Sequence, residues 1–289
     1  MALIPYKLIT SSPPFTFVVG HDQKEHTIHS ALIAHQSEAL KALVNEQTKE
    51  GTEGRVIWEH IHEDTFSRFS QYLYTGYYLE AEPKRRKGDA ATPKKFETNR
   101  FIPSLGSNGF EGLVAPKKQL LWNKFLGMHP LPPENASAMW SPPGIIIMPD
   151  GDYTEVFLCH ARMYVLANHY GIKALQILAL ANLRQILTLI NPSAKGCGDI
   201  NRLVRYCFGT ADKGCQVDEL KSLVCLYTAC KVEILWRNAE FRDITRTLPE
   251  FSSMLIGEML ARLDRSFLNT YNGNMRALLL GVVEINNSL

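Results

Sequence analysis

FTFVVGHDQKEHTIHSALIAHQSEALKALV, residues 15–44, is the stretch that decides the fold of the N-terminal part of this chain. It begins with a short apolar run rich in Phe and Val. A polar patch at residues 21–24 follows, and then a second brief extended piece that ends at Ile28. Two short runs rich in β-formers and separated by turn residues are typical of a β-hairpin. The sequence therefore predicts a hairpin at the start of the fold.

Short helical patterns follow the hairpin directly. Ser37 is at the position of a helix N-cap, and Glu38 follows in the first turn, where the positive end of the helix dipole favours a carboxylate. The apolar residues of this helix fall on one face; they are Leu40, Leu43 and Val44. We expect two small helices here.

The next stretch predicts one more strand and one more helix. RVIWE, residues 55–59, has the composition of a strand, and Asp64 can cap the helix that follows. An apolar stripe then runs along that helix through Phe66, Phe69 and Leu73. Gly76 suits the left-handed position at which a helix ends. Together these elements predict a compact α+β unit.

These residues resemble the BTB/POZ family. In the family pattern an apolar residue and a His precede a helix, a Ser begins the next helix, and a YLYTG motif closes the following one. The matching residues here are Ile28, His29, Leu32, Ser37, Leu40 and the run Tyr72-Leu73-Tyr74-Thr75-Gly76. A second motif of the family, YxLAxxY, resembles the run that contains Tyr164, Ala167, Asn168 and Tyr170.

The resemblance covers about half of the chain, and it is nearest to the many fungal proteins that have a single BTB domain and a helical tail. It implies an α+β, helix-rich BTB/POZ fold, a small sheet flanked by helical hairpins, followed by an all-helical extension. The expected segments are an N-terminal tail (1–13), the first half of the BTB domain (14–81), a flexible basic and Pro-rich insertion (82–152), the second half (153–190) and a helical C-terminal extension (191–289).

For function, the resemblance implies a non-enzymatic protein-interaction module. BTB domains form homo- or hetero-dimers, and many are adaptors that hold a substrate against a cullin-type ubiquitin ligase scaffold. The candidate interaction residues are Leu40, Leu43, Val44, Glu50, Phe66, Phe69, Tyr72 and Tyr74. Core packing is the competing interpretation, because the apolar members lie on stripes assigned to the interior. The residues expected to have structural roles are His29, which closes the turn into its helix, and Ser37, Gly76, Tyr164, Ala167 and Tyr170.

Two positions depart from the family pattern. Cullin-binding relatives carry an apolar residue, any residue and a Glu in the loop after the second small helix, whereas the nearest match here is Thr48-Lys49-Glu50. Dimerising relatives tend to place an Asp just ahead of the first strand, where this chain has Pro13-Pro14-Phe15. Cullin binding and a strand-swapped dimer are therefore not supported by these two local motifs.

The composition is that of an ordinary globular protein, with 45% hydrophobic and 21% charged residues. A formal net charge of +2 is too small to indicate a nucleic-acid or membrane partner. No apolar run approaches the roughly 18 residues of a membrane span, and residues 1–14 lack the pattern of a signal peptide. Six cysteines without a CxxC pair predict reduced, buried thiols. We expect a protein of the cytoplasm or nucleus that is not secreted.

The expected insertion carries a basic run at its start, Lys84, Arg85, Arg86 and Lys87. A solvated loop is one interpretation. The other is a nuclear-import signal, which would make the chain a nuclear regulatory or transcription-associated factor that uses these cations for import or nucleic-acid contact. No zinc finger or other DNA-reading module accompanies them, so sequence-specific DNA binding is not expected. Within the insertion, residues 118–126 predict a helix and residues 145–148 a strand that extends the sheet or covers its edge.

Helical patterns dominate the rest of the chain. Residues 156–167 are almost all apolar, and Gly171 is a plausible stop before a helix at 172–190. Three more helices are predicted at 199–208, 218–236 and 249–267. The apolar run ALLLGVVEI, residues 277–285, must be covered by the core or by a partner.

Motifs for catalysis or cofactor binding are not found. The chain has no glycine-rich phosphate loop, no GxSxG and no HExxH. His26 and His29 invite a zinc interpretation, but in a strand they point to opposite faces and no Cys lies nearby. Cys159 and His160 are neighbours in sequence, which does not indicate a catalytic pair, because such pairs are assembled in space. We expect no enzyme activity, no metal and no cofactor.

Overall fold

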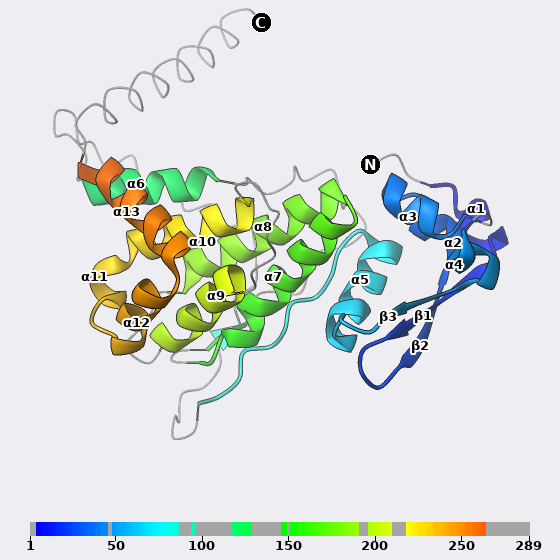
Figure 1. The fold of residues 1–289 in the computed structure, drawn as a ribbon, viewed down its shortest axis with the longest axis horizontal. Coiled ribbons are helices and arrows are strands. Elements are labelled where there is room, and N and C mark those ends of the chain that lie inside the picture. Colours follow the sequence, from blue (N-terminus) through cyan, green and yellow to red (C-terminus); the bar gives the residue numbers. More distant parts are fainter. Residues whose placement is uncertain are drawn as a thin grey trace, which may run out of the picture.

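Helices make up most of the structure, a computed structural model in which a small β-sheet lies at one end of an elongated molecule (Figure 1). The described residues are 4–45, 48–86, 94–95, 117–128, 146–148, 151–190, 196–209 and 218–263. The sheet and its short helices form one end, and a helical bundle forms the other. The chain is therefore α+β and helix-rich, as the sequence predicts.

The sheet is mixed and has three strands in the order β2-β1-β3. β1 (Pro14–Val19) pairs antiparallel with β2 (Lys24–His29), and β3 (Arg55–Trp58) lies parallel on the other side of β1. Gly20 and Gln23 both have positive φ angles in the turn that joins β1 to β2. The hairpin and the third strand are confirmed, and their register places Pro14 opposite His29.

The short helices follow local capping signals. Ser37 Oγ accepts a hydrogen bond from Leu40 N at 3.2 Å at the start of α3 (Glu38–Leu43), which follows α2 (Ser30–Ala34). Gly76, at φ 73°, ends α5 (Glu63–Thr75). The expected cap Asp64 lies instead in the first turn of α5, one residue inside the helix start, and His62 occupies the N-cap position without a side-chain bond.

Two helices occupy stretches where no helix is expected. α1 (Tyr6–Ser11) lies in the predicted tail, and α4 (Lys49–Glu53) lies between α3 and β3. Thr48 Oγ1 accepts a hydrogen bond from Gly51 N at 3.0 Å and so caps α4. Neither helix has a buried residue, so neither shows an apolar stripe in the sequence.

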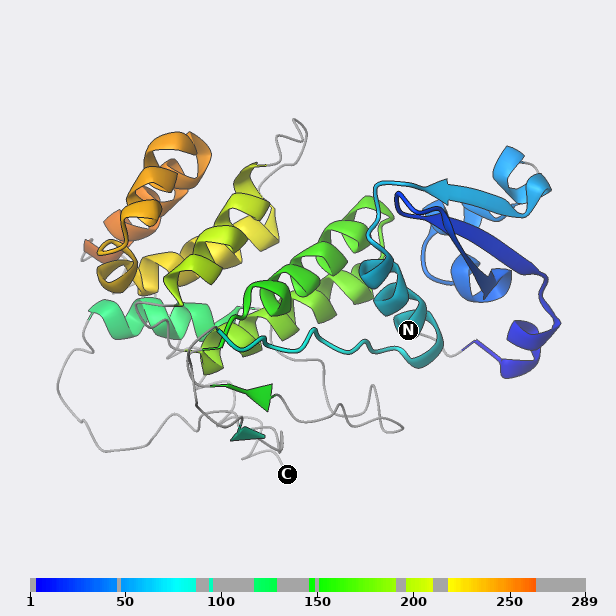
Figure 2. The same ribbon diagram turned by 90° about the horizontal axis from the view of Figure 1, so that it is seen from below.

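The bundle is built on two long helices, α7 (Thr154–His169) and α8 (Lys173–Leu189), which pack side by side (Figures 1 and 2). Gly171, at φ 69°, allows the turn between them. α9 (Cys197–Gly209) packs on α7 and α10 (Glu219–Cys230) on α8, and α12 (Ala239–Thr247) and α13 (Pro249–Leu263) pack on α9 and α10. The predicted helix at 218–236 is broken after Cys230, and α11 (Val232–Leu235) is its second part. α12 is not predicted, and residues 264–267 of the last predicted helix lie outside the described residues.

Parts of the expected insertion belong to the folded body. The helix predicted at 118–126 is confirmed as α6 (Lys117–Gly127), whose Leu121 and Phe125 are buried. Lys124 of α6 pairs with Glu258 of α13 at 2.7 Å. The strand prediction at 145–148 is wrong in its pairing, because β5 (Ile146–Ile147) pairs with β4 (Lys94–Lys95) and not with the three-stranded sheet.

The two ends of the insertion meet. The backbone groups of Lys84 and Asp152 exchange hydrogen bonds of 3.0 and 2.8 Å. Between α5 and this bridge the chain runs in an extended conformation along α7 (Figure 2). One apolar core extends from Phe15 in β1 to Leu255 in α13, without a break at residue 190. No described helix combines the length and apolar character that crossing a bilayer requires.

Candidate interaction surfaces

Four of the predicted interaction residues lie in the core. Leu40, Phe66 and Phe69 are fully buried, and Tyr72 is 4% exposed. Phe66 packs against Phe17 of β1, with ring centroids 5.1 Å apart, because its helix lays its apolar stripe on the sheet. For these four side chains the core interpretation holds, and a partner cannot contact them in this structure.

The other four predicted residues reach the surface to different extents. Leu43 and Val44 are half-buried and pack against the core, and Glu50 is half-buried in the first turn of α4. Tyr74 is 49% exposed. Thr48, at the place of the apolar residue in the cullin-binding pattern, has its hydroxyl bonded to Asn45 O at 2.7 Å and to Gly51 N. That side chain is therefore used as a helix cap.

Tyr74 is joined to the hairpin by His29. Its hydroxyl lies 2.9 Å from His29 Nδ1 and accepts from His29 N at 3.4 Å, so the imidazole ties the end of β2 to the end of α5. The role expected for His29 in the turn thus involves a contact across the fold that sequence spacing does not show. On the other side of α2, Ser12 Oγ accepts a hydrogen bond from Ala31 N at 3.3 Å and holds the end of α1.

Large apolar side chains are exposed on α1. Within α1, which the structure describes in full, no side chain is fully buried; Tyr6 is 78% exposed and Leu8 54%. We call Tyr6 and Leu8 together the α1 surface, and a hydrogen bond to Ser12 fixes their helix to α2. Tyr6 and Leu8 are not among the residues predicted from the sequence. The signal that could have found them is Pro5, since Pro is favoured at helix starts.

The YxLAxxY residues connect the two ends of the molecule. The ring of Tyr170 stacks on Trp58 of β3, with centroids 4.6 Å apart. Ala167 is fully buried, and its carbonyl accepts from Ile172 N at 2.8 Å at the turn into α8. Tyr164 is 4% exposed, and burial, together with the neighbouring Asp218 carboxylate, raises its pKa. These three residues hold α7 to the sheet, to α8 and to the start of α10.

The neighbours Cys159 and His160 anchor the extended segment that follows α5. His160 is 1% exposed; its Nδ1 lies 2.9 Å from the hydroxyl of Tyr78 and its Nε2 lies 3.5 Å from a Glu80 carboxylate oxygen. Cys159 Sγ accepts from Ala81 N at 3.5 Å. Burial raises the pKa of Cys159 to about 11, which is the opposite of what a nucleophilic cysteine requires. The pair therefore holds one stretch of chain on α7.

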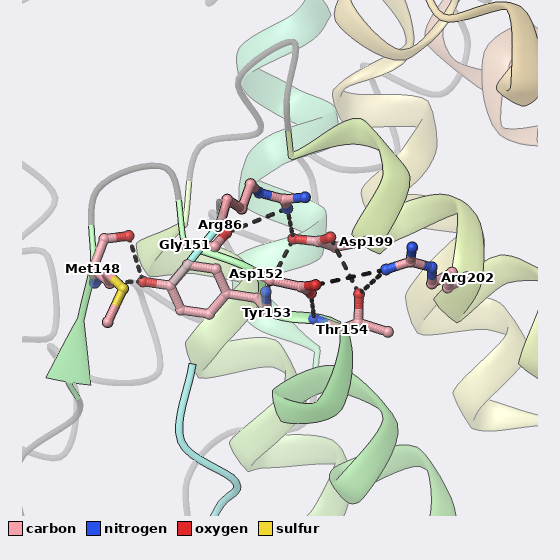
Figure 3. Close-up of polar contacts among 8 residues, drawn as sticks. All are labelled: Arg86, Met148, Gly151, Asp152, Tyr153, Thr154, Asp199 and Arg202. Carbon is pink, nitrogen blue, oxygen red and sulfur yellow. Dashed lines mark hydrogen bonds and ion pairs between the residues drawn. The ribbon is translucent and has the colours of Figure 1, made fainter. Parts of the chain in front are cut away.

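The side chains of the basic run lie in two environments, the surface and a buried polar site. Lys84 and Arg85 are exposed, and Lys87 lies outside the described residues. Arg86 turns inward: its guanidinium lies 2.5 Å from the carboxylate of Asp199 and donates to Gly151 O at 3.3 Å (Figure 3). Arg86 is thus a poor candidate for a free import signal in this structure.

Asp199 is the centre of this polar cluster (Figure 3). Its carboxylate is 2% exposed and also accepts from Tyr153 N at 3.0 Å and from the Thr154 hydroxyl at 3.2 Å. Arg202 donates to the Thr154 hydroxyl at 2.8 Å. The cluster joins the end of the extended segment, the start of α7 and the first turn of α9. The sequence places Asp199 at a helix start but does not show its partner.

Burial and hydrogen bonding act differently on the two carboxylates of the cluster. Burial raises the pKa of Asp199, while the Tyr153 amide and the Arg86 guanidinium act against that rise. Burial alone would raise the pKa of Asp152 as well. For Asp152, however, the hydrogen bonds from Thr154 and the charges of Arg86 and Arg202 outweigh burial and lower the pKa. The arrangement is that of a structural ion-pair network.

Among the described residues, no group of three or more His, Cys, Asp and Glu side chains is arranged to hold a metal ion. His26 and His29 are both half-buried, and the ring of His26 packs on Phe66 with centroids 4.9 Å apart. No family model and no curated protein matches this chain.

Proposed function

We propose that this chain is a non-enzymatic protein-interaction module of the BTB/POZ type and that it self-associates through the α1 surface. The order of elements supports the first part: a hairpin, three small helices, a third strand, a helix and, farther along the chain, a helical hairpin. The motif residues support it too, since Ser37 caps a helix, Gly76 ends one, and His29 and Tyr170 join separate elements.

The exposure of Tyr6 and Leu8 is the observation that carries the self-association. An isolated helix of this length is only marginally stable in water, and α1 gains little from burial. Large apolar side chains that lie exposed on one element mark interaction sites on soluble proteins. Covering Tyr6 and Leu8 in a second copy would stabilise α1 and remove this apolar area from water.

The experiment is a measurement of mass in solution by light scattering. The wild-type chain is compared with a Tyr6→Ser/Leu8→Ser variant and with a matched control, Val165→Ser/Ile177→Ser. The control changes exposed apolar residues on α7 and α8. Dimers of the wild type and the control, with a monomeric Tyr6→Ser/Leu8→Ser variant, would support the proposal. A monomeric wild type, or dimers of all three proteins, would overturn it.

Recruitment of substrates to a cullin-type ubiquitin ligase is the adaptor role that the family resemblance suggests. α4 is the element to test, since Glu50 lies in its first turn and Thr48 caps it. A Glu50→Lys variant is expected to lose binding to a purified cullin-type scaffold, while Glu53→Lys, a matched change in the last turn, retains it. Equal binding by both variants, or none by the wild type, would reject this role.

The alternative function, a nuclear regulatory factor, depends on the basic run. Lys84 and Arg85 have exposed side chains, but Arg86 is bound to Asp199, so the described part of the run offers fewer cations than the sequence suggests. We therefore favour the interaction module. Lys84→Ala/Arg85→Ala would abolish nuclear accumulation if the alternative holds, and an unchanged distribution would exclude it.

A further inference from the structure

An apolar groove lies between α11 and α13, at the end of the molecule opposite to the α1 surface (Figures 1 and 2). Its volume is about 670 Å³, and its apolar lining consists of Val232, Trp236, Leu255, Ile256 and Met259. Trp236 is 50% exposed and Ile256 58%. Leu260, one helical turn after Ile256, is 59% exposed and extends the same face of α13.

The sequence contains a segment suited to this groove. Residues 277–285, ALLLGVVEI, follow α13 and carry a single charge, on Glu284. Their apolar side chains match the apolar lining of the groove. Arg237 and Arg242 also line the groove and have the charge opposite to that of Glu284, and the carboxylate in the lining, Glu233, is paired with Arg262. Apolar complementarity with one charged pair at the edge is the usual composition of a small binding groove.

The length of the connection favours binding within one molecule. The groove residues on α13 lie four to eight positions before Leu263, which is about 6–12 Å along the helix axis. The 13 residues 264–276 separate Leu263 from the apolar segment. A chain of that length spans up to roughly 45 Å when extended. It can therefore turn back to the groove, and the short tether keeps the local concentration of the segment high.

We propose that residues 277–285 bind in the α11/α13 groove of the same molecule and cover Trp236 and Ile256. Contact with water is unfavourable both for the exposed apolar area of the groove and for the apolar side chains of the segment. Association of the two removes both areas from water. This docking is independent of the proposed self-association, since it uses the other end of the molecule.

Disulfide trapping in the full chain tests the contact. A chain with Ile256→Cys and Val282→Cys is compared with one carrying Val165→Cys and Val282→Cys, both with Cys215→Ser and under mild oxidation. Val165 is exposed on α7, away from the groove. Docking predicts an intramolecular disulfide in the first chain at least about tenfold faster than in the control. Equal rates would overturn the proposal, and disulfides between chains would assign the segment to a second copy and overturn it too.

Fluorescence of Trp236 gives a second readout that needs no cross-link. Acrylamide quenching is measured for the full chain and for a Leu279→Asp/Val283→Asp variant, and the signal of Trp236 is obtained by subtracting the matching Trp236→Phe proteins. Docking predicts stronger quenching when the two Asp residues are present, because they expel the segment from the groove. Asn287→Asp, a charge just outside the segment, should leave quenching unchanged. Identical quenching in all three proteins would overturn the proposal.

Discussion

Trp58 and Tyr170 stack with their ring centroids 4.6 Å apart and their planes 20° from parallel. Trp58 is the last residue of β3, and Tyr170 directly follows α7. The contact therefore joins the sheet to the helical bundle. Trp58 is 2% exposed and also packs edge-on against Phe17 at 4.7 Å, so the stack is continuous with the aromatic core under the sheet.

Replacing Tyr170 tests this junction. Tyr170→Ala removes the ring from a half-buried site and is expected to lower the free energy of unfolding by about 2–3 kcal/mol. Tyr170→Phe keeps the stack and should cost about 1 kcal/mol or less, because it removes only the hydroxyl. Urea unfolding measures both values. Equal losses in the two variants would mean that the ring stack contributes nothing.

Arg86 and Arg85 form a matched pair of neighbours with opposite environments. Arg86→Ala leaves the buried carboxylate of Asp199 without its cation and is expected to cost about 3 kcal/mol. Arg85→Ala removes an exposed charge and should change the free energy of unfolding by less than about 0.5 kcal/mol. Denaturant titration of both variants measures the difference. A loss on Arg85→Ala that matched the loss on Arg86→Ala would contradict the arrangement in Figure 3.

The decrease in the free energy of unfolding caused by Arg86→Ala should depend on pH. Burial raises the pKa of Asp199 above its ordinary 3.8, and Arg86 acts against that rise, so its removal raises the pKa further. A carboxyl with a raised pKa favours the folded state below the ordinary pKa, and this contribution is lost as the pH rises through the raised pKa. Arg86→Ala should therefore lower the free energy of unfolding more at about pH 7 than at about pH 4.5. A destabilisation that increased on acidification would contradict this prediction.

Gly76 tests the end of α5. Its φ of 73° is favourable only for residues that tolerate the left-handed region. Gly76→Ala is expected to lower the free energy of unfolding by about 1 kcal/mol, although no atom crowds the site. Gly76→Asn should cost less, because Asn adopts this conformation more readily than Ala. Thermal and urea unfolding compare the two, and equal costs would mean that backbone conformation is not the cause.

The buried cysteines predict slow modification of the native protein. Burial raises the pKa of Cys159 to about 11 and those of Cys225 and Cys230 to about 12, so thiolate is scarce at neutral pH. In a Cys215→Ser background, a disulfide reagent should react with the remaining thiols slowly in buffer and rapidly in denaturant. Fast reaction of the folded protein would contradict the burial of these side chains.

Sequence patterns predicted those elements whose signals are local. The hairpin, the cap at Ser37, the stops at Gly76 and Gly171 and the stripes of α8 and α10 all depend on residues within one or two turns of each other. α1 and α4 are missed because neither has a buried residue and so neither shows an apolar stripe. α12 is missed although Asn238 caps it and Phe241 and Ile244 share its buried face, so its signal is local and present in the sequence.

The sequence by itself determined the hairpin, the third strand and the longer helices with their apolar faces, because backbone conformation and side-chain periodicity are properties of neighbouring residues. The tertiary structure decided the rest. Only the folded chain shows that Tyr72 is in the core and Tyr74 at the surface, and that β5 pairs with β4. Only the folded chain shows that Arg86 pairs with Asp199 and that His29 contacts the hydroxyl of Tyr74. Each of these contacts depends on packing between elements that are far apart in the sequence, and a local sequence pattern contains no information about such packing.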